Sequence, residues 1–178
     1  MSDVANETIS AADFQEKYGG PTADQATLDP EQYDEIVAVD PGTTTGVAIL
    51  CEERLATTTQ DFWALMRRAR ADARPVRSLY IVEAPYKTGV THQRLVAGQN
   101  RLGAKLKIAQ NAGNVQREAE LLVEGLRQLD QDVLEHEPST SKKWGDDKLR
   151  RLIGDWNGPS NEHTRDAIMM LVAYGFLP

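Results

Sequence analysis

The chain has 178 residues, of which 40% are hydrophobic, and its formal net charge is −7. This length predicts a single globular domain, and no apolar stretch approaches the roughly 18 residues of a membrane-spanning helix. The N-terminal segment lacks the basic region and apolar core of a secretory signal. One cysteine, Cys51, excludes an internal disulfide, so we expect a cytoplasmic protein in which Cys51 is a small buried thiol.

Acidic residues are concentrated near the N-terminus. Residues 1–35 hold nine acidic residues and one basic residue, a net charge of −8, which leaves the rest of the chain with +1. Residues 1–33 predict a flexible acidic leader with a short helix at about 10–19. A helix this short is marginal alone, so it either docks on the body of the protein or binds a partner protein. The nearly neutral body, residues 34–178, removes most of the objection that the acidic total raises against a nucleic-acid partner.

Strand and helix patterns alternate along residues 34–178. Short apolar runs predict strands, and apolar residues at helical spacing predict helices. Their order predicts an α/β fold with a mixed central sheet of about five strands flanked by helices. We expect strands at 36–40, 46–50 and 54–59, a helix at 61–74, a strand at 78–84, helices at 90–110 and 114–129, a strand at 132–137, and helices within 141–153 and 161–175.

Carboxylates end two of the predicted strands. Asp40 ends the first strand before a Pro-Gly turn, and Glu83 ends the strand in LYIVEAPY. Neighbouring strand ends can bring two such acids to one edge of a sheet, and a buried carboxylate costs free energy unless it is paired or bound to a metal. At the start of the last, apolar helix, Asp166 follows His163 by three residues and Glu162 by four, so either pair shares a helix face.

Each of these residues has a structural interpretation when taken alone. An aspartate before Pro-Gly suits a turn, acids at a helix start complement its dipole, and a single histidine is often structural. As a set, their oxygens favour Mg²⁺ or Mn²⁺, and two such ions about 4 Å apart can clamp the attacking and leaving oxygens of a phosphoryl displacement. The residues therefore predict a metal-dependent phosphoryl-transfer site formed by Asp40, Glu83, His163 and Asp166.

Five segments occur in the order and approximate spacing of RuvC-type Holliday junction resolvases: VDPGTTTGVAIL, IVEAPY, QNAGNVQREAELL, PSTSKKWGDDK and HTRDAIMMLVAYG. The chain from Ile36 to Gly175 resembles this family, which has the ribonuclease H-like fold. The resemblance implies an endonuclease of DNA recombination and repair that cuts branched DNA by hydrolysis with two Mg²⁺ or Mn²⁺ ions per active site. The compact chain looks like the divergent bacteriophage members, which implies the bacterial host cytoplasm.

The resemblance also implies roles for single residues. Asp40, Glu83, His163 and Asp166 match the metal ligands, and Glu162 is the reserve for the position of His163. The family places an aromatic residue that stacks into the opened junction three positions after its glutamate, which is Tyr86 here. Its catalytic lysines look like Lys142 or Lys143 and Lys148. The DNA contacts implied are Tyr86, Lys87, Lys142, Lys143 and Arg150, and the contact of a homodimer is residues 91–110.

The chain also departs from this family. It is more acidic than is usual there, has an acidic leader and has a shorter lysine-bearing loop, which leaves Holliday junctions, forks and other branched DNA open as substrates. A catalytically idle or RNA-directed ribonuclease H-like protein is one alternative. VDPGTTTG also resembles the first phosphate loop of actin-like and sugar-kinase ATPases, but those proteins need two such lobes, which 178 residues do not supply.

Overall fold

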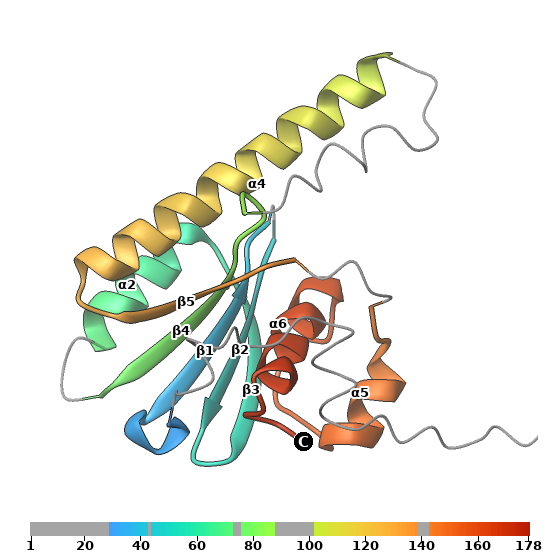
Figure 1. The fold of residues 1–178 in the computed structure, drawn as a ribbon. Helices are drawn as coiled ribbons and strands as arrows, with labels where there is room; N and C mark the ends of the chain where they lie inside the picture. Colours follow the sequence, from blue (N-terminus) through green and yellow to red (C-terminus); the bar gives the residue numbers. More distant parts are fainter. Residues whose placement is uncertain (1–28, 43, 73–75, 88–101, 139–142) are drawn as a thin grey trace, which may run out of the picture.

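The computed structural model describes residues 29–42, 44–72, 76–87, 102–138 and 143–178 (Figure 1). These residues form one five-stranded mixed sheet with helices packed against both faces, which confirms the predicted α/β class. The leader helix expected at 10–19, the first part of the expected dimer contact at 91–101, and Lys142 lie outside the described residues.

All five predicted strands are present, in the spatial order β3-β2-β1-β4-β5. A 3-10 turn, η1, precedes the first strand at Pro30–Gln32. β1 pairs antiparallel with β2, and β2 pairs antiparallel with β3. β1 pairs parallel with β4, and β4 pairs parallel with β5. The strands are β1 (Glu35–Asp40), β2 (Thr45–Cys51), β3 (Arg54–Gln60), β4 (Ser78–Glu83) and β5 (Asp132–His136).

Two apolar layers cover the sheet, because successive side chains of a strand point to opposite faces. Val37 and Val39 face α2 (Phe62–Asp72) and α4 (Leu102–Gln128). Ile36 and Ala38 face α6 (Glu162–Ala173), and α5 (Asp146–Ile153) packs beside α6 in the same layer. β1 is therefore buried on both faces, which explains why its sequence is a continuous apolar run.

The prediction of two helices at 90–110 and 114–129 is wrong for the part that the structure describes. α4 is one helix from Leu102 to Gln128 and runs through Gly113. A glycine inside a helix costs only about 1 kcal/mol relative to alanine, so it does not force a break. The 27 residues span about 40 Å, and the N-terminal part extends beyond the sheet (Figure 1). Among the described residues no helix is long and apolar enough to cross a membrane.

The expectation that Cys51 is buried is also wrong. Cys51 is exposed as the last residue of β2. The chain turns there through Glu52 and Glu53, which both have positive φ angles (47° and 64°) and join β2 to β3 as a tight hairpin. Burial already weakens along the second half of β2, so the apolar run continues past the edge of the core.

Candidate functional site

The two strand-ending carboxylates lie side by side at one edge of the sheet. β1 and β4 are parallel neighbours, and their register pairs Val39 with Val82, so Asp40 and Glu83 are the next residues of adjacent strands. Asp40 is 4% exposed, and Glu83 is partly buried. Parallel strands end at the same edge, so the sheet topology alone brings these carboxylates together.

The start of α6 brings His163 to the same edge. Nδ1 of His163 lies 2.7 Å from Oδ2 of Asp40. The helix backbone approaches β2 so closely that a Cβ added to Gly46 would lie 2.2 Å from the carbonyl carbon of His163. A capping box fixes the helix start, because Asn161 Oδ1 accepts from the amide of Thr164 and Thr164 Oγ1 accepts from the amide of Asn161, each at 2.9 Å.

A lysine bridges the two acids of α6. Nζ of Lys143 forms an ion pair with Asp166 and lies 3.0 Å from Oε1 of Glu162. The side chain of Asp166 is 13% exposed, whereas that of Glu162 is 64% exposed. Asp166 therefore belongs to the interior of the site and Glu162 to its rim.

The pKa values show that negative charge is crowded at this edge. Burial, followed by the charge of Asp40 and a hydrogen bond to it, raises the pKa of Glu83 to about 9. Burial also raises the pKa of Asp166, although Lys143 opposes this shift. The hydrogen bond to Asp40 raises the pKa of His163. Glu83 and Asp166 therefore hold a proton more readily than free carboxyl groups, and a bound cation would relieve the crowding of negative charge.

The donor set fits a hard divalent cation. For the residues that the structure describes, no three His, Cys, Asp or Glu side chains stand in the arrangement of a formed metal site. The chemistry is nevertheless suitable, because Asp40, Glu83 and Asp166 offer the carboxylate oxygens that Mg²⁺ and Mn²⁺ prefer. The ammonium group of Lys143 already lies beside Asp166 as a cation. His163 and Glu162 are adjacent on α6, and His163 contacts Asp40 directly.

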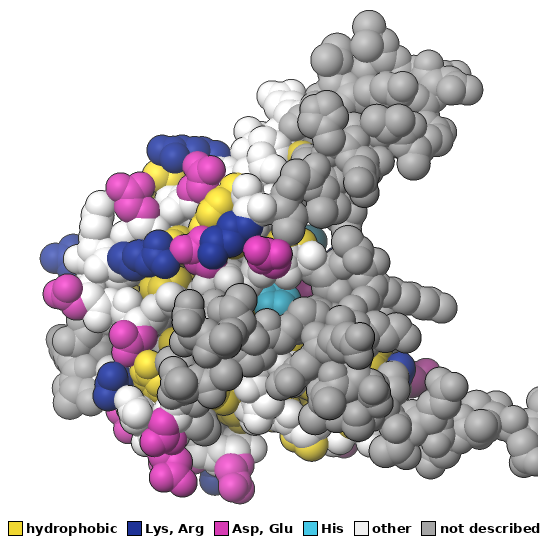
Figure 2. All heavy atoms as spheres, viewed as in Figure 1, with side chains coloured by type: hydrophobic (Ala, Val, Ile, Leu, Met, Phe, Trp, Pro, Cys, Tyr) yellow, Lys and Arg dark blue, Asp and Glu magenta, His cyan; other side chains and the backbone are white. Residues whose placement is uncertain are grey.

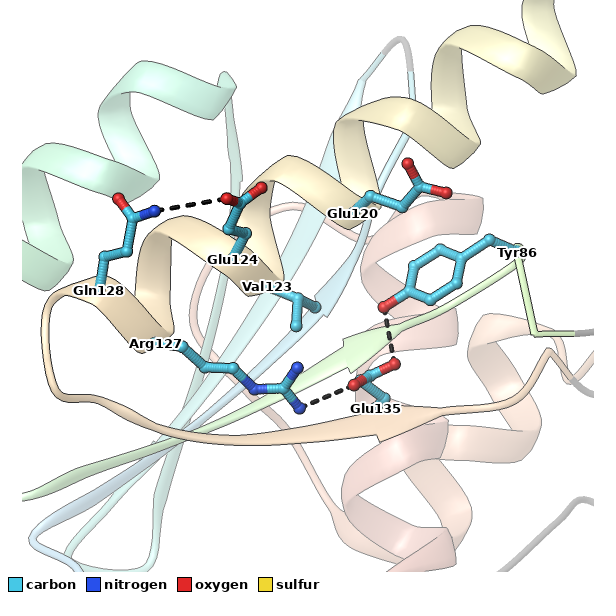
Figure 3. Close-up of a pocket in the computed structure, with 7 residues that line it drawn as sticks. All are labelled: Tyr86, Glu120, Val123, Glu124, Arg127, Gln128 and Glu135. Carbon is cyan, nitrogen blue, oxygen red and sulfur yellow. Dashed lines mark hydrogen bonds and ion pairs between the residues drawn. The ribbon is translucent and has the colours of Figure 1, made fainter.

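Tyr86 and Lys87, two of the predicted DNA contacts, both contact Glu135 of β5. Figure 3 shows the bond from Tyr86. The hydroxyl of Tyr86 donates to Oε2 of Glu135 at 2.7 Å, and Nζ of Lys87 lies 3.2 Å from the same oxygen. Arg127 of α4 pairs with Oε1 of Glu135 at 2.7 Å. These three donors outweigh burial and lower the pKa of Glu135. An open cavity of about 500 Å³ is lined by Tyr86, Arg127 and Glu135 together with Glu120, Val123, Glu124 and Gln128.

The sequence did not single out Glu135 and Arg127. The one available signal was Glu135 itself, an acid within a half-buried strand. A buried charge costs free energy unless it has a partner, so such an acid predicts an ion pair. Glu118 is a further residue that the motifs did not identify. Its Oε1 accepts a hydrogen bond of 3.3 Å from the hydroxyl of Thr45, which ties α4 to the turn after Asp40.

The remaining predicted bases lie on or near α5. Nζ of Lys148 lies 3.8 Å from the ring centre of Trp144. Arg150 pairs with Asp146 and with Asp155, each at 2.7 Å. Of the lysines assigned to the site, Lys143 is thus the one in the described segments with a recorded contact to Asp166.

Positive and negative side chains are mixed on the surface. Over α4 and β5, Lys and Arg side chains alternate with Asp and Glu side chains on the face that Figure 2 shows. A binding partner on this face would therefore meet alternating charges rather than one field of a single sign.

Comparisons of the chain with protein-family models, with curated protein sequences and with solved structures found no match. The geometry of the site and the sequence motifs are therefore the observations that bear on function.

Proposed function

We propose that the chain is a metal-dependent endonuclease with a ribonuclease H-like fold that cuts branched DNA, with the four-way Holliday junction as its substrate. The observation that carries this proposal is the convergence of acids from three elements: Asp40 of β1, Glu83 of β4 and Asp166 of α6. The mixed sheet, with two of these acids on adjacent parallel strands and the third on the last helix, supports the same fold.

Asp40, Glu83 and Asp166 are the residues that would hold Mg²⁺ or Mn²⁺, with His163 or Glu162 completing the set. Two ions bound there would supply an activated water and would neutralise charge on the phosphodiester. His163 orients Asp40, because its Nδ1 lies 2.7 Å from Oδ2 of that carboxylate. No nucleophilic side chain is needed for this hydrolysis.

Lys143 is proposed to contact the phosphate that is cut. Its ammonium pairs with Asp166 and Glu162 in the protein as described, and its own side chain is 44% exposed, so it can turn toward a bound phosphodiester. Tyr86 and Lys87 follow Glu83 by three and four residues, and this closeness to the site supports their proposed role as DNA contacts. Tyr86 is proposed to stack on an unpaired base at the crossover.

The active form is proposed to be a homodimer through residues 91–110. Two symmetric cuts in a four-way junction call for two equivalent sites related by a two-fold axis. The N-terminal part of α4, which includes residues 102–110, extends away from the sheet (Figure 1), and this supports a contact there. A monomer in light scattering at micromolar concentration, together with undiminished junction cleavage, would argue against the dimer.

Cleavage of a synthetic four-way DNA junction in Mg²⁺ tests the proposal. We expect paired symmetric nicks, and Asp40→Asn should slow them by about 100-fold or more while junction binding persists. Asp130→Asn makes the same chemical change at an exposed position with a positive φ angle (55°), which asparagine tolerates, and should cut normally. Linear duplex, forked DNA and RNA are the comparison substrates. Failure to cut any branched DNA in Mg²⁺ or Mn²⁺ would overturn the proposal.

A further inference from the structure

A second cavity, of about 460 Å³, opens beside the carboxylate cluster at the ends of β2 and β3. This volume is within the range of roughly 300–1,000 Å³ that small-molecule sites occupy. Gly42 belongs to its wall, and a Cβ added to Gly42 would lie 3.1 Å from Cε1 of His163. Gly42 therefore lies between the cavity and the proposed active site.

The strand register fixes how far this cavity is from Asp40. Asp40 pairs with Gly46 of β2, and Gly46 pairs with Thr59 of β3, which lines the cavity. Neighbouring strands lie about 4.8 Å apart, so Thr59 is about 10 Å from Asp40. A nucleotide adjacent to a phosphodiester held at Asp40 can reach across this distance.

Trp63 supplies an aromatic wall at the first turn of α2. Its side chain is 68% exposed, the largest value among the large hydrophobic residues that the structure describes. Phe62 holds it edge-on, with ring centres 5.1 Å apart and an angle of 85° between the planes. Leu65 and Ala69, on the other side of the helix, are buried in the core. Trp63 therefore offers its ring to a ligand rather than to the protein interior.

Gln60 also lines the cavity, and its side chain carries an unused hydrogen-bond acceptor that a small rotation of the amide would turn toward a ligand. Its Oε1 is buried and has no hydrogen-bond partner within the described part of the chain. Neighbouring polar groups are already engaged, because Thr45 donates to Glu118 and Asp61 accepts from the amide of Ala64. A buried acceptor without a donor costs free energy, so a ligand that brings an N–H group would compensate for this cost.

The charge of the lining residues distinguishes between kinds of ligand. Asp61 and Glu118 are acids, and none of the described residues that line the cavity is a lysine or an arginine. A phosphate would be repelled there. An uncharged, flat ligand with N–H donors would stack on Trp63 and donate to Gln60, which is the chemistry of a nucleobase.

We infer that this cavity, the base pocket, receives one unpaired nucleobase of the branched DNA next to the phosphodiester that is cut. The base stacks on Trp63 and donates an N–H group to Oε1 of Gln60. This inference takes its substrate class from the proposed function. It makes Trp63 and Gln60 residues that select the base beside the cut.

A set of four-way junctions tests the base pocket. Each junction carries the fluorescent base 2-aminopurine at a different position of the crossover. The full chain carries Asp40→Asn, so that the DNA is not cut, and binding is followed separately by anisotropy. We expect one position to change its 2-aminopurine fluorescence several-fold on binding. Trp63→Ala and Gln60→Leu should each reduce this change by at least half and alter the overall affinity less than about threefold. Val76→Ala, which shortens an exposed apolar side chain just before β4, should leave the change intact.

Two further outcomes separate this inference from the proposed function. Junction cleavage by the chain with Asp40 intact, without a response at any 2-aminopurine position, would overturn the base pocket alone. If Trp63→Ala abolishes the fluorescence response, but the chain with Asp40 intact cuts no DNA, the result would support the base pocket and overturn the nuclease. Absence of DNA binding would overturn both.

Gln60→Leu should also leave the melting temperature equal or higher, because it removes a buried acceptor without a partner. A clear decrease would identify Gln60 as a structural residue and overturn its role in selection.

Discussion

The hydroxyl of Tyr86 donates a hydrogen bond of 2.7 Å to Glu135, the carboxylate that also pairs with Lys87 and Arg127. The side chain of Glu135 is only 12% exposed. Figure 3 shows its bonds to Tyr86 and Arg127. One carboxylate thus orders the turn after Glu83 and cancels positive charge beside it. It bonds the hydroxyl of Tyr86 and neutralises much of the charge of Lys87 and Arg127, which limits how strongly these two cations could attract a phosphate.

Glu135→Gln is therefore expected to tighten DNA binding. The substitution keeps the shape of the side chain but frees Lys87 and Arg127 from an ion pair. Each freed cation that reaches a phosphate adds about 0.9 to the slope of log affinity against log salt concentration. Anisotropy titrations of a junction between about 50 and 200 mM salt should show the slope steeper by about 1–2. Glu124→Gln makes the same change of charge at an acid that bonds Gln128, and it is the control. Equal slopes in the two variants would contradict this role of Glu135.

Gly46→Ala is expected to destabilise the protein and to displace the start of α6. The added Cβ would lie 2.2–2.5 Å from backbone atoms of His163 and Thr164, and backbone cannot move as a side-chain end can. Overpacking of this kind costs about 1–3 kcal/mol. Urea unfolding measures the loss. Gly113→Ala has open space around its Cβ inside α4 and should gain about 0.5–1 kcal/mol. Unchanged stability of Gly46→Ala would contradict this prediction and would mean that α6 shifts to make room for the added Cβ.

The strands were predictable because their patterns are strong. β1 and β4 are runs of buried residues that each end in an acid, so a parallel pair with both acids at one edge follows from general rules of α/β sheets. α4 was not predictable as one helix, because Asn111 to Gly113 is a local interruption that hydrogen bonds and tertiary packing override. Cys51 was misplaced because an apolar run gives no sign of where the core ends.

The site was only partly predictable from the sequence. The spacing of His163 and Asp166 on α6 indicates a shared face, but no sequence rule chooses between neighbouring lysines. The structure gives Lys143 the contact with Asp166 and places Lys148 over the ring of Trp144. The contact of Lys143 joins residues 23 positions apart in the chain, which sequence spacing does not reveal. Glu135 was missed for a similar reason, since its partners come from the turn after β4 and from the end of α4.

His136 is expected to make stability depend on pH below neutrality. Burial lowers the pKa of this histidine to about 4, and its ring packs edge-on against Tyr174 at 5.7 Å. Between about pH 6.5 and 4 the unfolded chain binds a proton that the folded chain does not, so the free energy of unfolding should fall as pH falls. The decrease assigned to this residue is on the order of 3 kcal/mol. Urea unfolding at a series of pH values measures it, and His136→Phe should remove this part of the slope. Parallel curves for wild type and variant would contradict this, because they would mean that His136 takes up its proton over the same pH range in the folded and unfolded chains.

Lys143→Gln is expected to tighten Mn²⁺ binding and yet to slow DNA cleavage. The ammonium of Lys143 pairs with Asp166, so it competes with a divalent ion for that carboxylate. Removing a positive charge a few ångströms from a bound ion should raise the affinity by about tenfold, which isothermal titration calorimetry measures. Cleavage should fall because the phosphate loses its proposed lysine contact.

The control is Arg117→Gln, which removes an exposed cation of α4 that pairs with Glu120 at 3.0 Å. It should change neither the Mn²⁺ affinity nor the cleavage rate. Asp166→Asn should abolish the gain in affinity. Unchanged Mn²⁺ affinity in Lys143→Gln would show that the ammonium and the ion occupy separate places, and Asp166 would then lose its assignment as a ligand.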